Sequence, residues 1–169
     1  MADSAESQQL PPWKALYDNL GELMKAWKAA NESALGFHWK KIWPFSMFWP
    51  QVDFVRIGRI MDTTIKHAQD QVAITKRLLR GAETMSDGED LRNYYSVMIL
   101  YMEAFREVCS QLQIIAEMKQ KKLAKGKVRL LAIYRTTATY DTAIQSMSKL
   151  GFEAHKAWKG LAPSRSTAP

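Results

Sequence analysis

The chain has 169 residues, of which 47% are apolar, a size and composition that suit one domain with a substantial core. Its single cysteine, Cys109, excludes an internal disulfide, and no apolar run approaches the roughly 20 residues that a membrane-spanning helix needs. The net charge of +7 is distributed unevenly, because residues 1–117 carry 13 Lys/Arg against 15 Asp/Glu whereas residues 118–169 carry 11 against 2. A block of one charge sign attracts polyanions, which in cells are mainly nucleic acids and anionic membrane surfaces.

The first predicted element is a helix that begins at Pro11-Pro12, after a polar tail over residues 1–10 that we expect to be flexible. Apolar residues then recur at steps of three and four, which is the period of one helical face. The members of this face are Trp13, Leu16, Leu20, Leu23 and Trp27. The pattern predicts a helix that runs to about Asn31.

An aromatic segment follows, with six aromatic rings between Phe37 and Pro50. Pro44 and Pro50 exclude a long helix here. Three roles are open for the segment: a cap over the end of the core, a contact between subunits, or a foot at a membrane interface, which Lys40 and Lys41 would suit. The candidate interface residues are Trp39, Trp43, Phe45, Phe48 and Trp49.

Two more helices are predicted before the basic block. The second helix begins after Pro50 and ends at Gly81, with a stripe made of Ile57, Ile60, Met61, Ile65, Ala68, Val72 and Leu79. The third begins after the turn sequence Ser86-Asp-Gly-Glu-Asp, because Ser and Asp cap free helix amides. Its face contains Leu91, Tyr94, Met98, Met102, Phe105, Cys109, Leu112 and Ile115. We therefore expect Cys109 to be a buried small hydrophobe.

A fourth helix is predicted beyond Gly126, which marks a break inside the basic block. We expect this helix to end at Gly151 and residues 161–169 to form a flexible tail. Its predicted face contains Leu130, Ile133, Tyr134, Thr137, Ile144 and Met147. Because no stretch alternates as a strand does, the predicted fold class is all-α, a four-helix bundle in a single domain over residues 11–160.

The sequence offers no catalytic constellation. The three histidines are far apart and none has a metal-binding spacing, so we interpret His67 and Asp70 as a solvated pair. Glu103 and Glu107 lie one turn apart without a matching histidine and are expected on a solvated face. We predict that the protein is not an enzyme and has no catalytic residues, no metal site and no cofactor.

The basic block contains seven cations and no acid between residues 118 and 140. A protein that binds single-stranded RNA of any sequence needs phosphate neutralisation more than base readout, and such a block supplies it. The alternative is a solvated helix end without a ligand. The candidate RNA-binding residues are Lys119, Lys121, Lys122, Lys125, Lys127, Arg129 and Arg135.

Two segments carry a family resemblance. The run Gly151-Phe-Glu-Ala-His-Lys-Ala-Trp-Lys-Gly contains a Phe-Glu pair, Phe152 and Glu153, and then Trp158, shortly before a tail rich in Pro, Ser and Thr. The run Phe48-Trp-Pro-Gln-Val-Asp-Phe-Val-Arg-Ile is an aromatic-Pro element. Both features resemble the coat proteins of rod-shaped plant RNA viruses, which are single-domain four-helix bundles of about this size.

This resemblance implies that residues 31–43 form a short second helix. It also implies a structural role for Phe152, Glu153 and Trp158, with the ring of Phe152 folded back over the bundle after Gly151. The implied function is a capsid protein that assembles helically with copies of itself around single-stranded RNA, in the virion and the host cytoplasm.

Two functions are therefore open. The first is the self-assembling structural protein that packages single-stranded RNA in a helical capsid. The second is a helical scaffold or accessory subunit of an organellar complex on a membrane surface, with the segment from Trp43 to Trp49 as its foot. Both use the basic block, but only the second requires tryptophans to contact lipid.

Overall fold

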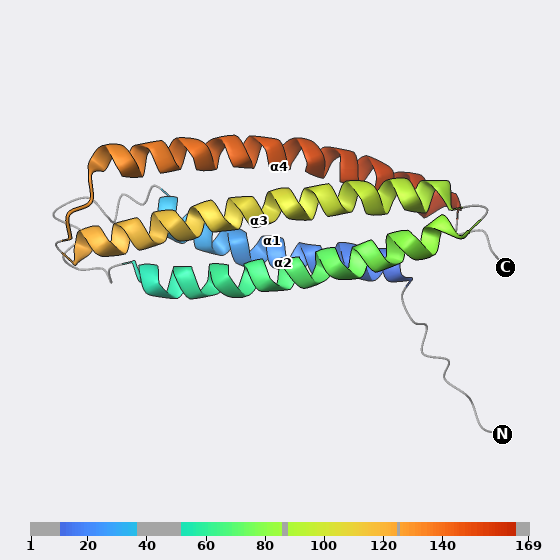
Figure 1. Ribbon diagram of the computed structural model, residues 1–169, viewed down its shortest axis with the longest axis horizontal. Coiled ribbons are helices and arrows are strands. Elements are labelled where there is room, and N and C mark those ends of the chain that lie inside the picture. The colour runs from blue at the N-terminus through green and yellow to red at the C-terminus, as the bar shows by residue number, and fades with distance from the viewer. Residues whose placement is uncertain (1–10, 37–51, 86–87, 125, 165–169) are drawn as a thin grey trace, which may run out of the picture.

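The computed structural model describes residues 11–36, 52–85, 88–124 and 126–164, with side chains up to Leu161. The described residues form four helices and no strand: α1 (Pro12–Leu35), α2 (Phe54–Glu83), α3 (Glu89–Leu123) and α4 (Leu130–Ser164). Consecutive helices run in opposite directions along one long axis (Figure 1). The predicted all-α four-helix bundle is confirmed.

The two ends of the bundle are formed by different parts of the chain. The C-terminal turns of α1 and α3 and the N-terminal turns of α2 and α4 lie together at the left of Figure 1, and we call this the basic end. The N-terminus of α1, the α2–α3 connection and the C-terminus of α4 lie at the opposite end. Helices α3 and α4 have 35 residues each, so the two ends are about 50 Å apart.

Local sequence explains where several helices begin and end. The Asp53 carboxylate caps α2 by accepting a hydrogen bond from the Arg56 amide at 2.9 Å. The predicted break at Gly126 is confirmed, because α3 ends at Leu123 and α4 begins at Leu130. A Cβ atom at Gly126 would lie 2.7 Å from the Lys121 carbonyl oxygen, so the turn between the two helices requires glycine.

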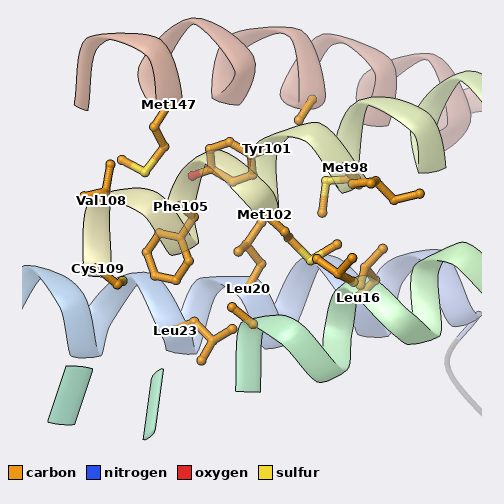
Figure 2. Packing of buried hydrophobic residues seen from close by; sticks show 14 of the residues in the cluster. Leu16, Leu20, Leu23, Met98, Tyr101, Met102, Phe105, Val108, Cys109 and Met147 are labelled. Carbon is orange, nitrogen blue, oxygen red and sulfur yellow. The ribbon is translucent and has the colours of Figure 1, made fainter. Parts of the chain in front are cut away.

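Helix α3 supplies more of the buried core residues than any other helix. All eight side chains of its predicted face are buried. Figure 2 shows Met102 and Phe105 of α3 directed toward Leu20 and Leu23 of α1. Cys109 is buried on this face, as predicted, and burial raises the pKa of its thiol to about 12. The thiol is therefore protonated at neutral pH.

Helices α1 and α4 contact each other through long side chains. The Trp27 indole Nε1 donates a hydrogen bond to the Tyr140 hydroxyl at 3.2 Å, and that hydroxyl donates to Asn31 Oδ1 at 2.6 Å. Nearer the opposite end, the rings of Tyr17 and Trp158 stack with centroids 4.9 Å apart. Burial raises the pKa of Tyr140 above its ordinary value, so its hydroxyl remains a donor at neutral pH.

The buried side chains of α4 recur every seven residues: Tyr140, Met147, Ala154 and Leu161. This heptad spacing is typical of helices that pack along one another at a shallow angle. Several predictions about α4 are wrong. Leu130 and Tyr134 are 68% and 74% exposed because neither lies on the heptad seam. The tail boundary at residue 160 is also wrong, since Leu161 is 1% exposed and the helix continues to Ser164.

Gly151 does not end α4, in contrast to the prediction. A Cβ atom at this position would lie 3.1 Å from Cε2 of Tyr101, so the glycine lets the α3 ring pack closely against the α4 backbone. Two other predicted ends move by a few residues, because α1 continues to Leu35 and α2 to Glu83. Residues 31–35 thus belong to α1 and not to a separate second helix. The rest of that predicted helix, residues 37–43, lies outside the described residues.

Candidate functional site

Most of the predicted basic residues lie together at the basic end. Lys121 and Lys122 occupy the last turn of α3, Lys127 and Arg129 lie in the connection to α4, and Arg135 is in the second turn of α4. All five are exposed. Helix α2 adds two exposed cations at the same end, Arg56 and Arg59. Lys125 lies outside the described residues.

Lys119 differs from the other predicted ligands of RNA. It is half-buried, and its ammonium donates a hydrogen bond to the Ala34 carbonyl oxygen at 2.8 Å. The same ammonium lies 5.7 Å from the centre of the Phe54 ring. Lys119 therefore joins the C-terminus of α1 to the start of α2 and the end of α3, which is a structural role.

Exposed apolar side chains lie among these cations. Leu123 is 53% exposed, Leu130 68%, Leu131 58% and Tyr134 74%. All four lie within about one turn of the connection between α3 and α4. The sequence pattern predicts Leu130 and Tyr134 on the buried face of the fourth helix, so it does not predict this exposed surface. The heptad series in the sequence consists of Tyr140, Met147, Ala154 and Leu161. This spacing could have shown that Leu130 and Tyr134 lie off the buried face of α4.

The placement of the cations is not explained by helix stability alone. Lys121 and Lys122 are favourable at the negative C-terminal end of α3. However, the first turn of α4 contains no acid, and Lys127 and Arg129 directly precede it. Cations near the positive end of a helix are unfavourable by roughly 0.3–1 kcal/mol. This arrangement costs stability and is consistent with a binding role.

A groove of about 680 Å³ lies between the start of α2 and the end of α3. Arg59 and Lys121 line it from opposite helices, together with Glu117 and Gly58. Nothing lies within 4 Å of the position that a Cβ atom at Gly58 would occupy, so the groove is open at this point. The groove thus adjoins the basic, apolar surface described above.

The acidic residues and histidines with helical spacings have ordinary surroundings. His67 and Asp70 are exposed and line a groove of about 650 Å³ between α1 and α2. Glu103 forms an ion pair with Lys76 of α2 at 3.2 Å, and Glu107 accepts a hydrogen bond from Gln111. Within the described residues, no three His, Cys, Asp or Glu side chains are grouped as metal ligands would be.

The residues that carry the coat-protein resemblance have mixed environments. Phe152 is 69% exposed, so the prediction that its ring folds over the bundle is wrong. The reason is that α4 continues through Gly151 and keeps Phe152 on an outer face. Glu153 is exposed, whereas Trp158 is half-buried and stacks with Tyr17. Five candidate interface residues lie outside the described part of the chain: Trp39, Trp43, Phe45, Phe48 and Trp49.

No family model, curated protein or solved structure matches this chain. The resemblance to viral coat proteins is therefore a hypothesis that no comparison supports. None of the helices in the described ranges combines the length and apolar character needed to cross a membrane.

Proposed function

We propose that this protein is a non-enzymatic helical scaffold that binds the surface of anionic membranes through its basic end. One observation carries the proposal: exposed leucines lie among exposed lysines and arginines on the same surface, around the α3–α4 connection. This combination is typical of proteins that insert apolar side chains below the head groups while cations contact the anionic lipid.

The cations and the leucines favour the same partner. Each Lys or Arg close to an anionic leaflet contributes about 1 kcal/mol, so Lys121, Lys122 and Lys127 together would contribute about 3 kcal/mol. Burying an exposed leucine adds roughly 1.5–3 kcal/mol when the side chain is fully transferred out of water. Leu123, Leu130 and Leu131 would thus contribute as much as the cations.

RNA accounts for only part of this surface. Phosphates would use the cations, and Tyr134 could stack on a base, but leucines gain little from either contact. A helical capsid would need a second partner, the next subunit, to cover the leucines. In addition, the exposed ring of Phe152 removes one structural match to the coat proteins. Binding of RNA is therefore the alternative that the experiment below must distinguish from membrane binding.

The test compares vesicles and RNA with the whole chain. Phosphatidylcholine vesicles with and without phosphatidylglycerol, and single-stranded RNA, are each sedimented with the protein. We expect binding to the phosphatidylglycerol vesicles that weakens with added salt. If the protein binds RNA but no vesicles, or forms rods with RNA in electron micrographs, the capsid hypothesis is supported and the membrane proposal is overturned.

Substitution of the exposed leucines distinguishes vesicle binding from RNA binding. Changing Leu123, Leu130 and Leu131 to Ser should remove most vesicle binding and leave any RNA binding unchanged. The control changes Ile74 and Leu100 to Ser, since these are also exposed apolar residues, at 43% and 52%, but lie in the halves of α2 and α3 that are farther from the basic end. Equal losses from both sets would contradict a docking role for the leucines.

Neutralising the cations tests the electrostatic part. Changing Lys121, Lys122 and Lys127 to Gln should weaken vesicle binding about 100-fold, which corresponds to about 3 kcal/mol. The control removes the same charge from the half of α4 farther from the basic end, by changing Lys149, Lys156 and Lys159 to Gln. If net charge alone mattered, both triple variants would lose the same affinity.

A further inference from the structure

The groove between α2 and α3 holds charged side chains in an ordered series. The ion pair between Lys76 and Glu103 shows which residues of the two antiparallel helices lie level with each other. Asp62 and Glu117 each lie fourteen residues from that pair, toward the basic end, and are therefore level with each other. Arg59 and Lys121 lie one turn nearer the basic end.

An apolar mouth completes the series. Phe54 and Val55 line the groove at the start of α2, and Val55 is 44% exposed. From the basic end inward, the groove is thus first apolar, then cationic and then anionic. This order matches a phospholipid that enters from a membrane at the basic end, with its acyl chains outside and its head group inside.

The opposing charges in the groove do not pair with one another. Among the described residues, the side chains of Arg59, Lys121 and Glu117 form no ion pair, whereas Asp62 is paired with Lys66 at 2.7 Å. Gly58 leaves the space beside Arg59 open, although a glycine inside a helix is less favourable than an alanine. A ligand with one anionic and one cationic group would occupy the gap and compensate both charges.

We propose that this groove binds the head group of a phospholipid with a primary ammonium, as in phosphatidylethanolamine. The phosphate would lie between Arg59 and Lys121, and the ammonium would donate hydrogen bonds to Glu117. Ethanolamine places its ammonium two carbon atoms beyond the phosphate oxygen, so the head group can reach from one helical turn to the next. Choline has no N–H to donate to Glu117. This inference rests on the proposed membrane docking and names the lipid that it prefers.

The experiment replaces part of the phosphatidylcholine in phosphatidylglycerol-containing vesicles by phosphatidylethanolamine. The net charge of the vesicle does not change, and we expect binding to tighten about three-fold, the gain typical of one exposed charge pair. Because phosphatidylethanolamine also alters lipid packing, the variant Glu117→Gln is needed. It should abolish the preference while leaving binding to phosphatidylglycerol vesicles intact. The control Glu107→Gln removes an acid from the same helix outside the groove and should keep the preference.

A second pair of variants tests occupancy of the groove. Gly58→Leu should fill it and abolish the preference for phosphatidylethanolamine. Gly21→Leu on α1, where a Cβ atom also meets nothing within 4 Å, should leave the preference unchanged. Helical circular dichroism of both variants verifies that they fold.

A soluble head group separates failure of the groove from failure of membrane docking. Titration with glycerophosphoethanolamine should shift the amide resonances of Gly58, Glu117 and Lys121 in a saturable manner. Glycerophosphocholine, which keeps the phosphate but cannot donate to Glu117, should need an about three-fold higher concentration for the same shifts. If vesicles bind equally with either lipid and these amides do not shift, the groove proposal is wrong and docking stands. If no vesicle binds, docking is wrong, and the titration still decides whether the groove takes this head group.

Discussion

The two parts of helix α4 differ in what their apolar side chains contact. From Tyr140 to Leu161, every seventh residue is buried against the neighbouring helices. From residue 130 to residue 139 no side chain is fully buried, although Leu130, Leu131 and Tyr134 are as apolar as those that follow. Apolar content is therefore not what decides burial here. Packing against the neighbouring helices decides it, since even Ile133, seven residues before Tyr140 on the same seam, is only half-buried. The apolar side chains of this part of α4 therefore remain available for a partner.

The largest change in the free energy of unfolding is expected at one of two tyrosines, which lie in the packed and the exposed part of α4. Tyr140 is 1% exposed and hydrogen-bonded to Trp27 and Asn31, whereas Tyr134 is 74% exposed. Tyr140→Ala should lower the free energy of unfolding by about 3–5 kcal/mol, because it leaves a cavity and an unpaired Asn31. Tyr134→Ala should change it by less than about 0.5 kcal/mol. Urea unfolding followed by circular dichroism measures both, and similar losses would mean that the two parts of α4 pack alike.

The C-terminal turns of α4 provide the next largest effect. Leu161 is 1% exposed, so Leu161→Ala should lower the free energy of unfolding by about 2–5 kcal/mol. Phe152→Ala should cost less than about 0.5 kcal/mol because the ring is 69% exposed. Thermal unfolding of the two variants tests the order. If Phe152→Ala lowers the free energy of unfolding strongly and Leu161→Ala does not, the Phe152 ring does cover the bundle and the flexible tail does begin after residue 160.

The packed part of the bundle should also determine how stability depends on alkaline pH. Burial raises the pKa of the Cys109 thiol from 9.0 to about 12. Above pH 9 the unfolded chain loses this proton while the folded chain keeps it, so the free energy of unfolding falls, by about 1.4 kcal/mol at pH 10. Cys109→Ala should remove this contribution. Urea unfolding at pH 8 and pH 10 provides the comparison, and an unchanged pH dependence in the variant would exclude Cys109 as its source.

The smallest change in the free energy of unfolding is expected at two helical glycines. Nothing lies within 4 Å of a Cβ atom at Gly21, so Gly21→Ala should raise the free energy of unfolding by about 0.5–1 kcal/mol. At Gly151 the new Cβ atom would lie 3.1 Å from the Tyr101 ring, which would have to move within the α3–α4 contact. Gly151→Ala should therefore give no net gain. Equal gains in melting temperature would show that α4 packs loosely at this level.

Part of the candidate site could be predicted from the sequence and part could not. The cations between Lys121 and Arg135 stand out as an acid-free run, and the structure places them at one end of the bundle. The exposed leucines could not be separated from core leucines by composition. Lys119 reads as one more cation of the block, yet it contacts Ala34 and Phe54 because α1 and α2 meet α3 at that level.

The sequence by itself determined the helical class, the break at Gly126 and the buried face of α3, because helical periodicity and turn chemistry are local properties. Only the tertiary structure decided which stripe of α4 is buried, since that depends on the surfaces that α1 and α3 present to it. It also decided that α4 continues through Gly151, where the ring of Tyr101 packs against the backbone. The groove that joins Arg59, Lys121 and Glu117 likewise follows from the antiparallel register of two helices, which arises from core packing between residues distant in the chain.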